Sequence, residues 1–240
     1  MTIDEAALHR LLDLQGEDSA IKRLDEERLT LPEAARLAEV TDQLAELTAD
    51  IEIATKQNDE VAREQTRLEG EIELLEQKTT REEQRMYSGN VANPKELSAL
   101  QAEIEMLKKQ RATIEDTLLE VMVQKDQSSG TLESLQAEHR QASEESATLT
   151  KVVGALTDDI DSQLREHHSK RDEVAASIPP DLLTMYDKLR EQKHGVGAAA
   201  LEAGTCQGCH TKLPAKEVER LKAEGGLQRC DNCRRILVVG

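Results

Sequence analysis

The sequence contains no Phe and no Trp, and its two Tyr residues are Tyr87 and Tyr186. Without aromatic bulk, a round core would have to be built from Leu, Ile and Val alone, whereas an elongated helical protein buries only a narrow apolar seam. Charged residues make up 33% of the chain. The composition therefore favours a mainly α protein with long helices over a compact globule.

Long apolar runs are also absent. No segment approaches the roughly 18 apolar residues that a membrane span needs, and no basic run precedes an apolar stretch in the first residues. We therefore expect a cytoplasmic protein with no signal peptide, no lipid anchor and no membrane partner. Thiols stay reduced in that compartment, which bears on the cysteines below.

Negative charge dominates, with a net charge of −17. Residues 196–240 differ, because seven Lys or Arg and five Asp or Glu give this segment a charge of +2. The acidic remainder should repel nucleic acid and anionic membranes. Such charge is also typical of the solvated face of a coiled coil.

The stretch from Gly89 to Glu96 predicts a chain reversal. Gly89 suits a helix end, because glycine adopts the left-handed conformation without a Cβ clash. Asn93 suits an N-cap, Pro94 suits the first helical position, and Glu96 has the spacing of a capping box. A helix end followed closely by a helix start predicts an antiparallel hairpin with its tip at residues 88–93.

Both sides of this turn carry the heptad pattern of a coiled coil. Alternating steps of three and four visit mostly apolar residues from Leu37 to Leu75, and again from Leu97 to Ile160. The exceptions include Asn58, Gln65, Lys125 and Ser128. Polar residues in such a seam fix the register at a cost in stability. An intermolecular coiled coil would show the same heptads, but the capped turn favours a hairpin within one chain.

Prolines mark the other boundaries. Pro32 predicts a kink, which counting back from the turn sets beside residues 146–154. Pro179-Pro180 ends the long helix, and a short helix and a hinge at residues 194–197 follow. We therefore expect three regions: a coiled-coil hairpin at 1–177, a short helix and hinge at 178–197, and a metal-binding ribbon at 198–240.

The four cysteines form two C-x2-C pairs, Cys206/Cys209 and Cys230/Cys233, separated by twenty residues. This spacing is typical of one structural Zn²⁺ held by four thiolates. Two disulfides and a rubredoxin-like iron centre are the alternatives. A catalytic zinc is disfavoured, because four cysteines leave no open position for water.

Within the pairs, Gly208 and Asn232 occupy equivalent places, and both residue types tolerate a positive φ. We expect His210 to be a bystander rather than a metal ligand. A short helix at 214–224 and short β-strands around each pair complete a ribbon that depends on its metal to fold.

The ribbon is mildly basic. The basic residues are Lys212, Lys216, Arg220, Lys222, Arg229, Arg234 and Arg235. They could contact phosphate or an acidic protein surface, or they could be ordinary surface charge. No aromatic residues are interleaved with them for base stacking.

Three motifs together carry a family resemblance. They are Tyr87-Ser-Gly-Asn-Val-Ala-Asn-Pro-Lys-Glu-Leu97 with Leu100-Gln101, Ile178-Pro-Pro-Asp-Leu182, and the cysteine quartet. The chain resembles the bacterial C4-type zinc-ribbon proteins with an N-terminal coiled-coil hairpin, long described as a domain of unknown function. The resemblance implies a kinked hairpin topped by a zinc ribbon and a role as adaptor or regulator. Some relatives are tied to flagellar or type III secretion systems, an alternative sigma factor or RNA.

We therefore expect a non-enzymatic adaptor or regulator that acts through protein contacts at the tip and the ribbon. The candidate tip contacts are Tyr87, Asn90, Asn93 and Lys95. Nucleic-acid binding through the basic ribbon is the alternative. No catalytic set or phosphate loop stands out, so we expect neither an enzyme nor a small-molecule substrate. The adjacent His167 and His168 are expected to face solvent.

Overall fold

The computed structural model describes residues 4–89, 91 and 93–239. The helices are α1 (Glu5–Leu29), α2 (Pro32–Tyr87), α3 (Pro94–Ala176), α4 (Pro180–Gln192) and α5 (Ala215–Glu224). The strands are β1 (Ala198–Glu202), β2 (Thr205–Cys206), β3 (Gln228–Arg229) and β4 (Ile236–Val239). The predicted class, a long helical hairpin with a small C-terminal sheet, is confirmed. The chain forms two compact units, residues 37–148 and residues 1–36 with 149–240.

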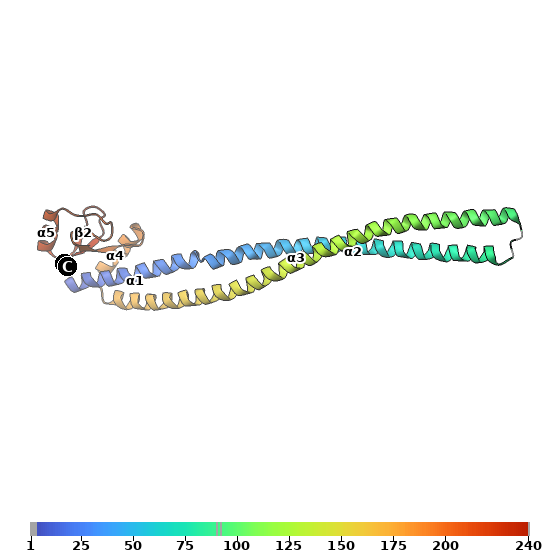
Figure 1. The fold of residues 1–240 in the computed structure, drawn as a ribbon. Helices are drawn as coiled ribbons and strands as arrows, with labels where there is room; N and C mark the ends of the chain where they lie inside the picture. Colours follow the sequence, from blue (N-terminus) through green and yellow to red (C-terminus); the bar gives the residue numbers. More distant parts are fainter. Residues whose placement is uncertain (1–3, 90, 92, 240) are drawn as a thin grey trace. The chain divides into compact units, whose positions relative to one another are not determined.

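In the unit of residues 37–148, α2 and α3 lie side by side as an antiparallel pair (Figure 1). Their buried seam consists of Val40, Leu47, Ala54, Leu68, Leu100, Ile104, Leu107, Val121 and Ala142. Each of these residues lies on the predicted heptad pattern. The seam also continues one step past Leu75 to Thr79, which is 8% exposed.

The turn between the two helices has the predicted caps. Gly89 has a φ of +75°, and the side-chain oxygen of Asn93 accepts a hydrogen bond from the amide of Lys95 at 3.0 Å. Glu96 differs from a capping-box residue, because its carboxylate pairs with Arg85 across the hairpin at 3.2 Å. Asn93 therefore caps the start of α3, and the Arg85–Glu96 ion pair joins the two helices beside the turn.

The polar exceptions in the heptads meet one another. The side-chain oxygen of Asn58 accepts hydrogen bonds from Lys125 Nζ, Ser128 Oγ and Ser129 Oγ, each at 3.0 Å. These four residues form a half-buried polar layer in the seam. The layer specifies which residues of α3 face Asn58, because any shift along the helix would leave the Lys125 ammonium without this acceptor.

In the unit of residues 1–36 and 149–240, the predicted break is present. α1 ends at Leu29, and α2 begins at Pro32. Leu31, directly before Pro32, belongs to one buried cluster with Ile160 and Leu164, against which Leu156 packs. The position of Pro32 beside residues 146–154 of α3 stays a prediction.

α1 and the last part of α3 also contact each other through polar side chains in this unit. Glu17 Oε2 lies 2.7 Å from His167 Nδ1, and Arg28 pairs with Asp161 at 3.1 Å. The expectation that His167 faces solvent is therefore wrong, because Glu17 covers it. His168 is exposed.

The small sheet has the strand order β2-β1-β4-β3. β1 and β4 are parallel, and the two outer pairs are antiparallel. Successive residues of β4 face opposite sides, as the two-residue period of a strand requires. Ile236 and Val238 pack with α1 and α4, whereas Leu237 packs with α5 and the cysteines. Helices therefore cover both faces of the sheet.

Candidate metal centre

Each cysteine pair sits in the same backbone turn. In the first turn, the amide of His210 donates to the carbonyl of Cys206 at 2.8 Å. In the second, the amide of Arg234 donates to the carbonyl of Cys230, also at 2.8 Å. The residue after each pair takes the left-handed conformation, with φ of 52° at His210 and 63° at Arg234. Two equivalent turns thus present two thiols each.

The four thiols converge on one point. All four Sγ atoms lie within 4.8 Å of one another. The Cys206–Cys233 and Cys209–Cys230 sulfur pairs are 4.0 and 3.9 Å apart. Zn–S bonds of about 2.3 Å in a regular tetrahedron give sulfur–sulfur edges of about 3.8 Å. The geometry therefore fits a single tetrahedral ion with four sulfur ligands.

The thiols also differ in how readily they ionise in the metal-free ribbon. Burial raises the pKa of Cys206 to about 12, and it also raises the pKa of Cys230. Hydrogen bonds from Thr211 and then Asn232 lower the pKa of Cys209 to about 6. Four thiolates this close together need a compensating cation, and a bound metal ion supplies it by replacing the protons.

Gly208 and Asn232, which lie inside the two cysteine pairs, have roles other than the predicted tolerance of a positive φ. Gly208 and Asn232 do not have a positive φ; the residues that do are His210 and Arg234. A Cβ on Gly208 would lie 2.8 Å from Arg235 Cδ and 2.9 Å from Ala199 Cβ, so glycine is needed there for space. Asn232 instead donates its side-chain amide to Thr211 Oγ1 at 2.9 Å and to Cys209 Sγ at 3.6 Å.

Thr211 was not among the predicted site residues. Its side chain lies next to the first pair and shares the Asn232 amide with a sulfur. A hydroxyl two residues after a cysteine is a weak signal in a sequence, because threonine is common in turns. His210 is exposed and does not join the sulfur cluster, in line with the prediction.

The seven basic residues of the ribbon differ in their exposure and in their contacts. Arg235 is half-buried and donates to three backbone carbonyls, those of Val196, Gly208 and Lys193, at 2.7–3.0 Å. Arg220 is bonded to Glu217 and Glu224. The remaining five are Lys212, Lys216, Lys222, Arg229 and Arg234, and of these only Arg229 is half-buried rather than exposed.

The candidate tip residues lie at the end of the hairpin in the unit of residues 37–148. Tyr87, the last residue of α2, is 80% exposed. Asn93 and Lys95 are exposed as well. Asn90 lies outside the described residues. Of the three described residues, only Asn93 has an evident structural role, as the cap of α3.

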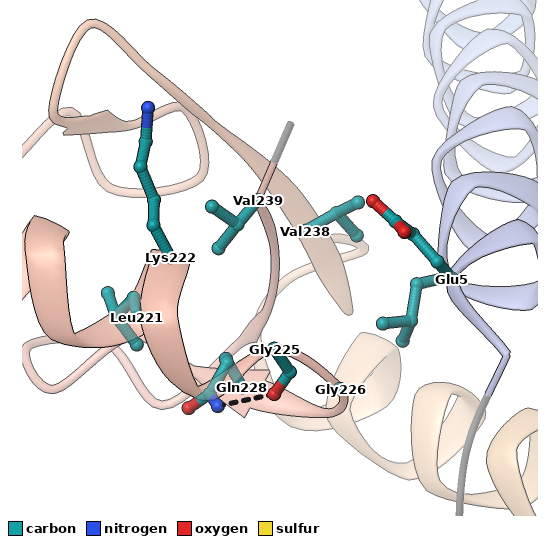
Figure 2. Close-up of a pocket in the computed structure, with 9 residues that line it drawn as sticks. Glu5, Leu221, Lys222, Gly225, Gly226, Gln228, Val238 and Val239 are labelled. Carbon is teal, nitrogen blue, oxygen red and sulfur yellow. Dashed lines mark hydrogen bonds between the residues drawn. The ribbon is translucent and has the colours of Figure 1, made fainter.

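A separate cavity of about 310 Å³ lies where α1 meets the ribbon (Figure 2). Figure 2 shows Glu5 on one side, Lys222 on the other, and Val238 and Val239 of β4 between them. Its other lining residues are Leu8, Leu221, Gly225, Gly226 and Gln228. These lining residues include one carboxylate and one ammonium but no Ser, Thr, Cys or His. They therefore do not form a set for nucleophilic catalysis.

In the part of the chain that the structure describes, no helix combines the length and apolarity needed to cross a membrane.

Known proteins share both parts of this architecture. Residues 14–194 match the model of the CT398-like coiled coil hairpin domain, and residues 205–237 match the C4-type zinc ribbon domain. An uncharacterized protein of Mycobacterium tuberculosis, Rv2229c, is 28% identical over 237 residues, which cover 95% of this chain and 93% of that protein.

Two solved structures have the same fold. A protein from Mycobacterium smegmatis has a TM-score of 0.83 at 23% identity, with both chains covered completely. CT398 from Chlamydia trachomatis has a TM-score of 0.69 at 21% identity, with 98% of each chain covered. The hairpin model spans well over half of the sequence, and the family predicted from the motifs is confirmed. The chain belongs to the CT398-like coiled-coil hairpin family and carries a C4-type zinc ribbon.

Proposed function

We propose that this protein is a non-enzymatic, zinc-binding adaptor whose hairpin tip docks onto a protein partner. The exposed side chain of Tyr87 carries the proposal, since it is 80% exposed. Tyrosine is enriched at protein interfaces, because its ring offers a large apolar face at a low conformational cost. An aromatic ring left in solvent, in a chain with two Tyr and no Phe or Trp, suits a contact residue.

The tip is held by other residues than Tyr87. Asn93 caps α3 at 3.0 Å, the Arg85–Glu96 pair spans the hairpin at 3.2 Å, and Lys108 pairs with Glu83 at 2.8 Å. These contacts hold the ends of α2 and α3 on either side of the turn. Helix ends that are already held in place lose less entropy on binding, which favours recognition.

The proposed role of the metal is structural. We propose one Zn²⁺ bound by Cys206, Cys209, Cys230 and Cys233, which would join the two turns of the ribbon. Four sulfur ligands close the coordination sphere and leave no position for a substrate. The proposal implies a cytoplasmic setting, because a zinc tetrathiolate requires reduced thiols.

A crosslinking pull-down from the native cell tests the docking role. The Tyr87→Ala and Lys95→Ala variants should keep the melting temperature of the wild type and lose the captured partner. Leu119→Ala is the matched control, because Leu119 is 61% exposed on α3 and lies away from the turn in sequence. Capture of the same partner by the Tyr87 and Lys95 variants at wild-type yield would overturn the proposal.

The alternative role is nucleic-acid binding through the ribbon. It is supported by the exposed Lys212, Lys216 and Lys222, whose ammonium groups are accessible to phosphate. The logarithm of the binding constant for RNA and DNA oligonucleotides should then fall linearly with the logarithm of the salt concentration. The magnitude of this slope should decrease when these lysines are changed to Ala. No binding at low salt would remove this alternative.

A further inference from the structure

We propose that metal binding in the ribbon is coupled to the packing of α1 against α3 and α4, through Arg235 and Gln15. The inference rests on the zinc binding proposed above and adds a consequence for the helices. The contacts that carry it all lie within the unit of residues 1–36 and 149–240.

Arg235 is the first connection. It lies two residues after Cys233, and its guanidinium donates to the carbonyl of Gly208, inside the other cysteine pair, at 2.7 Å. The same side chain donates to the carbonyls of Lys193 at 3.0 Å and Val196 at 2.9 Å. Arg235 thus bonds the metal-binding turn to residues 193–197, the segment that joins α4 to β1.

Gln15 of α1 is the second connection. It is 8% exposed, and its side-chain oxygen accepts from the amides of Gly197 at 2.7 Å and Ala198 at 3.3 Å. Its side-chain amide donates to the carbonyl of Gly195 at 2.9 Å. One side chain of α1 thereby satisfies three backbone groups of the joining segment and the start of β1.

Asp18, one turn further along α1, extends the network to the helices. It is 3% exposed and accepts from Tyr186 of α4 at 2.6 Å, Arg171 of α3 at 2.9 Å and Arg190 of α4 at 3.1 Å. The Tyr186 hydroxyl also lies 3.2 Å from the side-chain oxygen of Gln15. Gln15 and Asp18, the two buried polar side chains of α1, therefore share Tyr186 as a partner.

Loss of the metal should weaken first the contacts of Arg235 and then those of Gln15. Without the ion, the turn at Gly208 is no longer fixed, and Arg235 loses the position of one of its three acceptors. Release of residues 193–197 would then leave Gln15 buried without its backbone partners, which is unfavourable. Coupling of this kind is reciprocal, so a change at Gln15 or Arg235 should also weaken metal binding.

Hydrogen–deuterium exchange of the full-length protein tests the coupling, before and after zinc is removed with EDTA. Zinc content is measured first, so that a chain without bound zinc overturns the metal site itself. The coupling predicts faster exchange in residues 11–24 and 182–190 as well as in the ribbon, with residues 37–148 unchanged. Faster exchange in the ribbon alone, or equally throughout the chain, would overturn it.

Neighbouring arginines provide a matched pair of variants. Arg235→Gln should weaken zinc affinity by about tenfold in competition with a chelator, and it should speed hydrogen exchange in residues 11–24. Arg234→Gln is the control, because Arg234 is exposed and its ion pair is with Asp231 at 3.9 Å. Gln15→Ala leaves the cysteine turns intact and should also weaken zinc affinity. Wild-type zinc affinity in both Arg235→Gln and Gln15→Ala would contradict the proposal.

Discussion

The side-chain oxygen of Asn58 on α2 lies 3.0 Å from the Nζ of Lys125 on α3, within a seam that is otherwise mostly apolar. Ser128 and Ser129 donate to the same oxygen. Asn58→Leu removes the acceptor of a half-buried ammonium and two hydroxyls. We expect it to lower the free energy of unfolding by about 1–3 kcal/mol, measured by urea denaturation.

The double variant Asn58→Leu/Lys125→Leu tests the same polar layer in the opposite direction. Replacing both polar groups by apolar ones fills the seam and removes the desolvated charge, so its stability should equal or exceed that of the wild type. A single Asn58→Leu variant that is already more stable than the wild type would show that the polar layer does not hold Lys125.

Asp18 is a second site where removing charge should be costly. Asp18→Asn leaves Arg171 and Arg190 beside a neutral, buried amide, and we expect a loss of about 3–5 kcal/mol in stability. Asp161→Asn is the control, because its pair with Arg28 is only partly buried, with side chains 33% and 47% exposed. Thermal melts that show equal losses for both variants would argue against a special role for Asp18.

Tyr186 should resist ionisation at alkaline pH. Burial, together with the hydrogen bond to Asp18, raises the pKa of Tyr186 well above its ordinary value. A folded-state pKa above the unfolded one stabilises the fold below about pH 10 and loses that effect as the pH rises further. In a Tyr87→Phe variant, tyrosinate absorbance at 295 nm should therefore appear only as the helical circular dichroism is lost. Half-ionisation near pH 10 with the helices intact would refute this.

Gly208 should be intolerant of a side chain. Gly208→Ala places a Cβ 2.8 Å from Arg235 Cδ and 2.9 Å from Ala199 Cβ. We expect it to destabilise the ribbon by about 1–3 kcal/mol and to speed zinc loss to a chelator. Gly70→Ala, where a Cβ meets nothing within 4 Å, should instead stabilise α2 by about 0.5–1 kcal/mol. Equal zinc retention by Gly208→Ala and the wild type would contradict the steric argument.

Most of the fold follows from local patterns in the sequence. The heptads, the Gly89 and Asn93 caps and the break at Pro32 depend on residues close together in the chain, and all three are seen in the structure. The cysteine spacing likewise predicted a cluster of four thiols. The individual contacts across the seam, such as that of Asn58 with Lys125, depend on long-range packing and do not follow from the heptads alone.

The polar network around α1 is harder to predict from the sequence. Gln15 and Asp18 fall at helical spacing from Leu11, so the apolar stripe of α1 could have marked them as buried. Gln15 bonds to Ser19 within α1, but the partners in α3, in α4 and at residues 195–198 are more than 150 residues away in the chain, and no local pattern connects them. The sequence also does not separate Arg235 from the other basic residues of the ribbon, since its three acceptors are carbonyls that any sequence supplies.

The central claim is that one zinc ion is held by the four cysteines. Measuring the metal content and the ligands of the bound ion tests this claim most directly. We predict one zinc per chain by elemental analysis of the purified protein, and X-ray absorption that shows four sulfur ligands at about 2.3 Å. A Cys206→Ser/Cys230→Ser variant should lose the zinc. A protein without bound metal, or a zinc with nitrogen or oxygen ligands in place of the cysteines, would contradict the account.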